Sequence, residues 1–203
     1  MRDLFNPTDG EPLPLDTYLA DYEQRFWAIT DHDFWKLERQ QTFQEPGFGS
    51  WEAFTQGRWD EALRLIEAER DGFEEYFARL AKHQIAFTRV RVVEEPIAPY
   101  LQWELHVLHL RQACGERVRV IGPDTISRLE TDRPLSELIT LGDDAMYQIQ
   151  YNQEGVLDGA LRFTDRATIT RCRNLIEDLY AEGEDLSSYF PRVVARLTPP
   201  QPA

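Results

Sequence analysis

A strand, a helix and a second strand follow one another between residues 85 and 121, and this order constrains the fold more than any other feature. Residues 85–93 (IAFTRVRVV) and 117–121 (RVRVI) are rich in β-branched side chains, whereas residues 99–113 have helical spacing after Pro96. A crossover of this length joins parallel strands, and such crossovers are almost always right-handed. The segment therefore predicts a βαβ unit.

Patterns on both sides extend this unit into a larger sheet. Further strands are expected where apolar and polar residues alternate, at residues 34–38, 145–151 and 156–163, the last two joined by a turn. Helices are expected where apolar residues recur every three or four positions, at residues 16–25, 59–83 and 165–182. We therefore expect an α+β fold, with a mixed sheet of about five strands that contains one βαβ crossover and a C-terminal hairpin, flanked by helices.

The length of 203 residues predicts one folded domain. We expect an N-terminal extension with a short helix over residues 1–32, a single α+β domain over 33–190 and a loose C-terminal tail over 191–203. There is no apolar leader at the N-terminus, and no run approaches the ~20 apolar residues that span a bilayer. Cys114 and Cys172 fit free thiols, so we expect a cytoplasmic protein with no membrane association.

The charge balance indicates the kind of partner. Acidic residues number 36 against 22 lysines and arginines, which gives a net charge of −14. Such a surface repels nucleic-acid backbones, so we expect a partner protein or a small ligand instead of direct nucleic-acid binding. The sequence lacks a phosphate-binding glycine loop, a dinucleotide fingerprint and a nucleophile elbow, so it indicates no cofactor and no catalytic residues. It gives no indication of oligomeric state.

Arginines alternate with valines in both strands of the βαβ unit. Arg89 and Arg91 share one face of the first strand, and Arg117 and Arg119 share one face of the second. If the crossover helix covers the valines of neighbouring strands, the four arginines gather on the opposite face. That arrangement predicts an anion-binding patch. The alternative is that acidic side chains of the 59–83 helix cover and neutralise the arginines.

The crossover helix carries polar side chains beside its apolar ones. Glu104 follows Trp103 on a largely apolar side, and a carboxylate there needs a cationic partner, either Arg91 or Arg119. His106 and His109 share a helical face, but without a third ligand we expect no metal site. The candidate ligand-binding residues are Arg89, Arg91, Arg117, Arg119, Glu104, Trp103 and His106.

Three stretches of the chain carry a family resemblance. They are residues 34–57 (FWKLE, later FTQG), residues 89–105 (RVRVVEEP, later YLQWEL) and residues 151–181 (YNQEG, then a hairpin and a helix). Over residues 33–181 the chain resembles an actinobacterial domain-of-unknown-function family, whose members are often encoded beside XRE-type helix-turn-helix regulators. The element order also resembles a phospholipase-D-type half-domain, although the catalytic HxKxxxxD motif is absent. The resemblance implies a role near transcription regulation or signalling.

Three functions are compatible with these observations. The first, which we expect, is a non-catalytic regulatory or interaction protein that binds a partner protein, such as a helix-turn-helix regulator, or a small anionic ligand. The second is an enzyme acting on a phosphorylated or carboxylated small molecule, in which the arginines bind the anion, Glu104 orients an arginine, and His106 or His109 transfers protons. The third is a structural subunit of a larger assembly, which an exposed apolar patch would favour.

Overall fold

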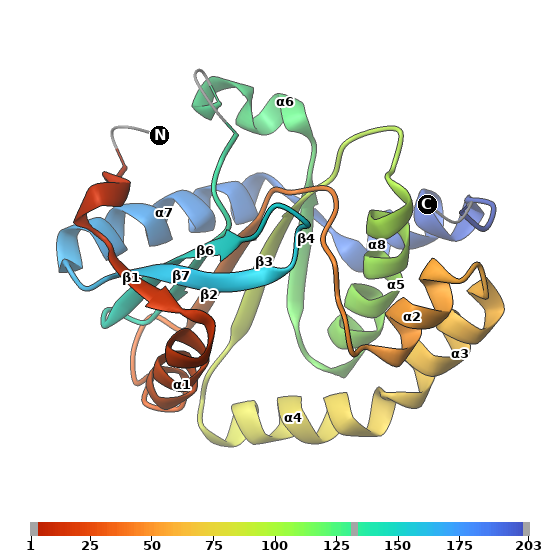
Figure 1. Ribbon diagram of the computed structural model, residues 1–203, viewed down its shortest axis with the longest axis horizontal. Coiled ribbons are helices and arrows are strands. Elements are labelled where there is room, and N and C mark those ends of the chain that lie inside the picture. Colours follow the sequence, from red (N-terminus) through yellow and green to blue (C-terminus); the bar gives the residue numbers. More distant parts are fainter. Residues whose placement is uncertain (1–3, 131–133, 201–203) are drawn as a thin grey trace.

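The computed structural model describes residues 4–130 and 134–200 (Figure 1). The strands within these ranges are β1 (Glu11–Pro14), β2 (Phe34–Glu38), β3 (Phe87–Val92), β4 (Arg117–Ile121), β5 (Leu138–Leu141), β6 (Ala145–Tyr151), β7 (Leu157–Phe163) and β8 (Glu184–Asp185). The α-helices are α1 (Leu15–Phe26), α2 (Gly49–Thr55), α3 (Trp59–Ala68), α4 (Arg70–Lys82), α5 (Pro99–Cys114), α6 (Pro123–Ile126), α7 (Arg166–Glu182) and α8 (Leu186–Arg192). Short 3-10 turns occupy Pro7–Asp9, Ser127–Leu129 and Val194–Arg196. The outermost three residues of the expected N-terminal extension and C-terminal tail lie outside the described ranges.

All these strands form one mixed sheet in the order β1-β7-β6-β5-β2-β3-β4-β8. The pairs β2–β3 and β3–β4 are parallel, and the other neighbours are antiparallel. The structure confirms the α+β class, the β3–α5–β4 crossover and the β6–β7 hairpin.

The expected number of about five strands is wrong, because the sheet also contains β1, β5 and β8. Strand β1 carries Pro12 and Pro14, which cannot donate to a ladder and are tolerated because β1 lies at an edge of the sheet. Strand β5 is a short, fully buried run without alternation, and β8 has only two residues. None of the three has the alternating pattern from which the other strands were expected.

The single helix expected over residues 59–83 is two helices, α3 and α4, that meet at Glu69. Ile66 of α3 packs into a cluster with α2 and α5, whereas Phe77 and Leu80 of α4 pack into a different cluster near the start of β3. The bend at Glu69 lets the two apolar stripes reach two separate cores.

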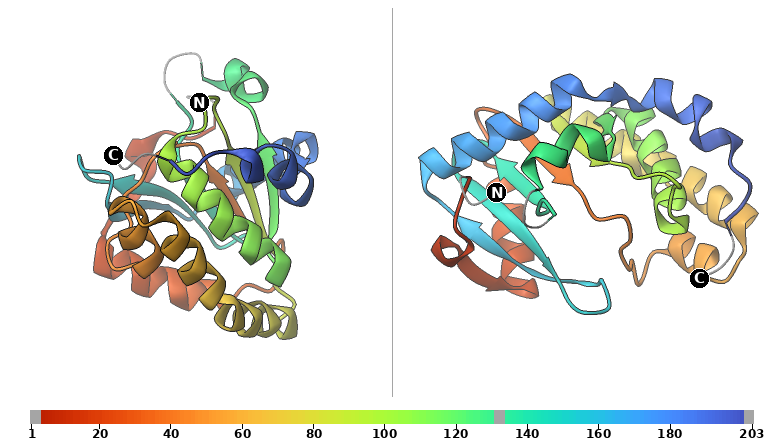
Figure 2. Two further views of the ribbon diagram at one scale, coloured as in Figure 1. Left: turned by 90° about the vertical axis from the view of Figure 1, so that its right-hand side faces the viewer. Right: turned by 90° about the horizontal axis from the view of Figure 1, so that it is seen from above.

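Helix α7 covers one face of the sheet, as Figure 2 shows from above. Beneath it, Leu37, Val90 and Met146 from three different strands pack against Ile169 and Ile176 of the helix. This apolar layer is continuous across the middle of the sheet. None of the helices in the described part of the chain is long and apolar enough to cross a membrane.

Two separate apolar cores lie on the opposite face. One lies beneath α1 and α4, around Phe34 and Phe87. The other lies beneath α5 and α8, around Val118 and Val120. Between them, the C-terminal halves of β2 and β3 present charged side chains to this face. This charged strip is the part of the sheet that distinguishes the protein, and the candidate site lies beside it.

Candidate ligand-binding site

The register of β3 and β4 separates the four arginines into two pairs. Across these parallel strands Arg89 pairs with Val118 and Arg91 pairs with Val120, and residues paired in this way point to the same face. The arginines of β3 therefore lie on the α5 face with the valines of β4, while the arginines of β4 lie on the α7 face. The expectation of a four-arginine patch is wrong, because the alternation in the two strands is out of phase by one residue.

The arginines of β4 have separate surroundings. Arg117 is exposed at the start of the strand. Arg119 donates from Nη1 to the backbone carbonyl of Tyr180 at 3.1 Å and to that of Ala181 at 3.4 Å. These carbonyls belong to the last turn of α7, where backbone acceptors lack partners within the helix. Arg119 thus supplies hydrogen bonds to backbone carbonyls at the C-terminal end of α7.

The histidines of α5 pack against aromatic rings. The ring of His106 lies 5.3 Å from that of Trp59 and 4.8 Å from that of Phe190, and His109 stacks on Phe190 at 4.0 Å. Burial, with a smaller contribution from His109, lowers the pKa of His106 to about 4. His106 is therefore neutral at pH 7 and is unsuited to proton transfer near that pH.

Arg89 is the centre of a chain of buried ion pairs. Its Nη1 donates to Glu38 at 2.5 Å, and its Nε donates to Glu116 at 2.6 Å. Glu38 also binds Lys36 at 2.5 Å, and Glu116 accepts a hydrogen bond from Arg111. The side chains of Arg89, Glu38 and Glu116 are at most 8% exposed, so their charges are stable only because each has an opposite partner. We call these five residues the ion-pair chain.

Neighbouring cations keep the carboxyl group of Glu38 ionised. Burial alone would raise the pKa of this carboxyl, but attraction to Arg89, Lys36 and Arg91 holds the pKa below its usual value. The acidic partners of Arg89 come from β2 and from the residue before β4. The alternative expectation was that acidic side chains of the 59–83 helix neutralise the arginines. It is correct that carboxylates neutralise Arg89, and wrong that these carboxylates come from that helix.

Arg91 forms a second buried pair behind the chain. Its Nε donates to Oε2 of Glu104 at 2.7 Å, and its Nη1 donates to the backbone carbonyls of Glu38 and Val92. The structure thus confirms that Glu104 pairs with an arginine, and the partner is Arg91. The remaining Nη2 of Arg91 is buried without a hydrogen-bond acceptor in the described part of the chain.

A pocket of about 420 Å³ opens beside the ion-pair chain, between the charged strip, the loop before α2, and helices α3 and α5. This volume is in the range of sites for small molecules. Its charged lining residues are Lys36, Glu38, Glu45, Glu69, Arg89, Glu104 and Arg111, and its aromatic ones are Phe48, Phe73, Tyr100 and Trp103. The structure thus brings three candidates, Arg89, Glu104 and Trp103, to one pocket.

The remaining candidates do not line this pocket. Arg91 lies behind Glu104, and Arg117, Arg119 and His106 lie elsewhere. Sequence reasoning missed Lys36 and Glu38, although two charges two residues apart in the apolar strand FWKLE were a signal for a charged strand face. Glu116 gave no comparable signal, because it follows Gly115 in a turn and is buried only through tertiary contacts.

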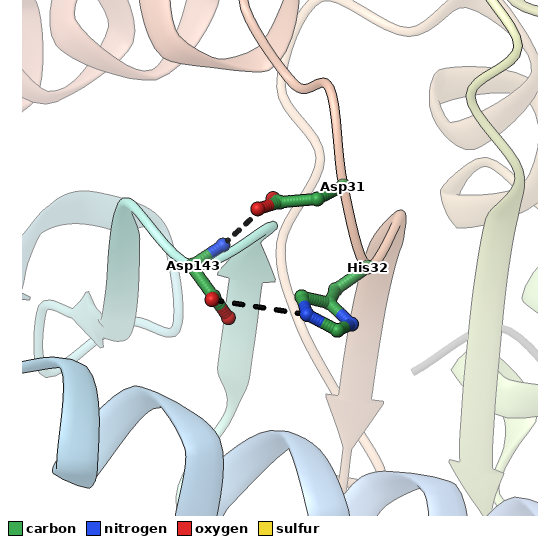
Figure 3. Close-up of side chains that lie close together, drawn as sticks. All are labelled: Asp31, His32 and Asp143. Carbon is green, nitrogen blue, oxygen red and sulfur yellow. Dashed lines mark hydrogen bonds and ion pairs between the residues drawn. The ribbon is translucent and has the colours of Figure 1, made fainter.

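A second polar cluster lies at the turn between β5 and β6 (Figure 3). Asp31 accepts a hydrogen bond from the backbone N–H of Asp143 at 3.3 Å, and His32 Nε2 lies 3.7 Å from Oδ2 of Asp143. Three potential metal-ligand atoms lie within 4.8 Å of one another. Asp143 is already paired with Arg173 at 2.5 Å and Arg166 at 3.1 Å, so its charge is compensated without an ion. We interpret the cluster as a salt-bridged turn.

Fold and site together define a protein of the α+β class with a ligand-sized pocket on one face of a mixed sheet. A family model, described as a domain of unknown function (DUF6879), matches residues 20–191, and the chain belongs to this family. The matched range includes every residue that lines the pocket. No curated protein and no solved structure matches the chain. The resemblance to a family of unknown function is therefore confirmed.

Proposed function

We propose that this protein is a non-catalytic regulatory or interaction protein that binds a small molecule in the pocket beside the ion-pair chain. The observation that carries the proposal is the combination of a ligand-sized volume, aromatic walls and prearranged charges in one pocket. The ion pairs hold the pocket floor rigid, so a ligand meets groups that are already ordered. Binding then requires little reorganisation of the site.

The position of the pocket supports a regulatory role. Helices α2 and α3 pack on α5 as an outer layer, and the pocket lies between this layer and the sheet. A molecule in the pocket would contact α3, α5 and β2 at once. Its binding would stabilise one position of the outer layer relative to the sheet, and a partner protein could recognise that position.

An enzyme acting on a phosphorylated or carboxylated molecule is the alternative, and the geometry gives it less support. Arg89 is already bound by two carboxylates, so it offers little charge to an anionic substrate. His106 and His109 pack against Phe190 and do not line the pocket. The roles assigned to these histidines in proton transfer therefore have no place at this site.

The partner in this proposal is a helix-turn-helix regulator of the XRE type. The resemblance to actinobacterial proteins encoded beside such regulators motivates this choice, and the net charge of −14 suits a basic DNA-binding surface. The proposal places both proteins in the cytoplasm. In this context the phospholipase-D-like shape would be a scaffold without its chemistry.

A thermal-shift screen of a metabolite library tests whether the pocket binds a small molecule. At a concentration of about 100 Kd a ligand stabilises its protein by about 2.7 kcal/mol, which raises the Tm of a chain of this size by roughly 5–10 °C. We expect such a shift for the wild-type protein and its loss in Ser50→Trp, which fills the pocket from α2. Glu52→Trp places the same side chain on the exposed face of α2 and should keep the shift.

Three outcomes would contradict the proposal. If no compound stabilises the wild-type protein, or if Ser50→Trp keeps every shift, the pocket is not the binding site. If a stabilising compound is converted to a product by the wild-type protein and not by Ser50→Trp, the enzyme alternative replaces ours.

A further inference from the structure

The basic side chains that line the pocket all have ion-pair partners, whereas the acidic ones do not all have one in the described part of the chain. Four carboxylates and three cationic side chains form the lining. All three cations, Lys36, Arg89 and Arg111, already have carboxylate partners in the ion-pair chain. The lining carboxylates Glu45 and Glu69 form no ion pair within the described ranges. The uncompensated charge at the pocket is therefore negative, opposite to that of an anion-binding site.

Glu45 is the carboxylate best placed to meet a ligand. It is half-buried in the loop before α2, and one oxygen accepts a hydrogen bond from the Tyr100 hydroxyl at 3.0 Å. Burial raises the pKa of Glu45, and this effect outweighs the opposing hydrogen bond from Tyr100 and the attraction of the more distant Lys36 and Arg89. Glu104 also lines the pocket; it binds Arg91 through Oε2, and its Oε1 forms no hydrogen bond with the residues that the structure describes, which leaves it as a second acceptor.

Aromatic rings form the other walls. Trp103 contacts Tyr100 with ring centroids 5.5 Å apart, and Phe73 completes the inner surface. Phe48 stands at the rim and is 60% exposed, one of the few large apolar side chains in this state. Its neighbour Gly47 has φ +92°, so the loop adopts a conformation that few other residues allow. Faces of aromatic rings attract flat molecules and cations.

A buried hydrogen-bond donor without an acceptor is an independent indication that the pocket binds a ligand. Trp103 is 4% exposed, and its indole Nε1–H forms no hydrogen bond with the residues that the structure describes. A buried polar group without a hydrogen-bond partner destabilises the folded protein by about 1–3 kcal/mol. Trp103 lines the pocket, and a ligand that carries a hydrogen-bond acceptor would supply that partner where a small rotation of the ring brings the indole nitrogen to the pocket surface.

We propose that the ligand is a small heteroaromatic or aromatic cation, whose positive group binds between Glu45 and Glu104 and whose ring lies against Trp103 and Phe48. This inference rests on the proposed function, since it names the chemistry of the same pocket. It replaces the anionic ligand that the arginine pattern of the sequence had predicted. The acceptor atom for Trp103 favours a heteroaromatic ring over a purely hydrocarbon one.

Matched compounds that differ in charge test the ligand class. Tryptamine is compared with indole-3-acetate, and benzamidine with benzoate, by isothermal titration calorimetry on the full-length protein. We expect both cations to bind more tightly than their anionic counterparts. Glu45→Gln should weaken cation binding roughly 10-fold to 100-fold, as the loss of a hydrogen bond to a charged group predicts. Glu52→Gln, an exposed substitution on α2, should leave the affinity unchanged.

A second variant tests the aromatic contact without touching any ion pair. Phe48→Ala should weaken the aromatic cations about 3-fold to 10-fold, in line with a cation–π contact. Leu19→Ala also removes an exposed apolar side chain, but away from the pocket, and should have no effect. Circular dichroism of each variant verifies its fold before titration.

The outcomes separate this inference from the proposed function. If the anions bind in place of the cations, and Ser50→Trp abolishes that binding, the ligand class is wrong and the pocket function stands. If neither cations nor anions bind, while the metabolite screen yields pocket ligands that are neutral, the ligand class is again wrong. If neither experiment detects binding at the pocket, both proposals fail.

Discussion

At the scale of single residues, Glu137 is the one buried carboxylate without an ion-pair partner among the residues that the structure describes. Its Oε1 accepts hydrogen bonds from the backbone N–H groups of Arg39 at 2.8 Å and Gln40 at 2.7 Å, while Oε2 is buried without a described partner. Burial and the negative charge of Glu38 raise the pKa of Glu137 to about 7, against a smaller opposing effect of Arg91. The folded protein therefore binds a proton here that the unfolded chain releases near pH 4.3.

Taken alone, this difference makes the stability fall as the pH rises. Between pH 4.3 and 7 the folded state holds the proton of Glu137 and the unfolded state does not, so this group lowers the free energy of unfolding by roughly 3–4 kcal/mol over that range. His106, whose pKa is lowered to about 4 by burial, acts in the opposite direction between about pH 4 and pH 6.5. Glu137→Gln should remove the Glu137 contribution alone, so between pH 5 and pH 8 the stability of the variant should rise relative to that of the wild type. Urea denaturation at pH 5 and pH 8 measures both proteins, with Glu182→Gln on the surface as the control. Equal slopes in wild type and Glu137→Gln would contradict the assignment.

At the scale of secondary-structure elements, one glycine decides how β1 joins the sheet. Gly159 of β7 has φ +148°, and a Cβ there would lie 2.3 Å from the backbone oxygen of Leu13 in β1. No side chain fits that position without displacing the edge strand.

Two glycine substitutions should therefore have effects of opposite sign. Gly159→Ala should lower the free energy of unfolding by about 1–3 kcal/mol, because it combines a disfavoured φ with a backbone clash. Gly72→Ala lies in α4, where nothing comes within 4 Å of an added Cβ, and should raise the free energy of unfolding by about 0.5–1 kcal/mol. Chemical denaturation of both variants measures these changes. A stabilised Gly159→Ala would show that β1 is not held as described.

The elements also show how far sequence patterns reach. The bounds of β2, β4 and β6 agree with the expected strands, and α7 agrees with the helix expected over residues 165–182, because these features depend on local residues. The relative phase of β3 and β4 is not local. It depends on where α5 ends and on how the turn at Gly115 and Glu116 enters β4, so the separation of the arginines could not be predicted.

The same limit applies to the candidate site. Arg89, Glu104 and Trp103 were identified because charge and aromatic character on a buried face are visible in the sequence. Their meeting with Glu45 and Phe48 depends on the loop before α2, which no periodic pattern describes. The sequence shows the arginines and conceals the buried carboxylates that neutralise Arg89, so the anionic ligand stays a prediction that the titrations test.

At the scale of the whole molecule, the net charge of −14 controls encounters with other macromolecules. If the partner is a basic regulator, attraction between the two surfaces should accelerate association and should weaken as salt screens it, with a Debye length of about 10 Å at 0.1 M. We expect the Kd to rise at least about tenfold between 50 and 300 mM NaCl, mainly through slower association. Surface plasmon resonance with the purified regulator measures both rates.

A short duplex of the regulator's operator DNA serves as the competitor in that experiment. Because the protein would occupy the same basic surface, added duplex should displace it. Binding that is insensitive to salt, or a ternary complex with the duplex, would place the contact on another surface. Failure of the regulator to bind at low salt would remove it as the partner.

The ion-pair chain also has a consequence for how this family can diverge. Replacing a single member leaves a buried charge uncompensated, which costs about 3–5 kcal/mol of a total stability that is commonly 5–15 kcal/mol. Lys36, Glu38, Arg89, Glu116 and Arg111 should therefore be inherited together or exchanged together. The rim residues Glu45, Phe48 and Ser50 belong to no ion pair in the described part of the chain and are free to vary one at a time. Relatives would then keep one pocket floor for long periods while they acquire new ligands by changing the rim.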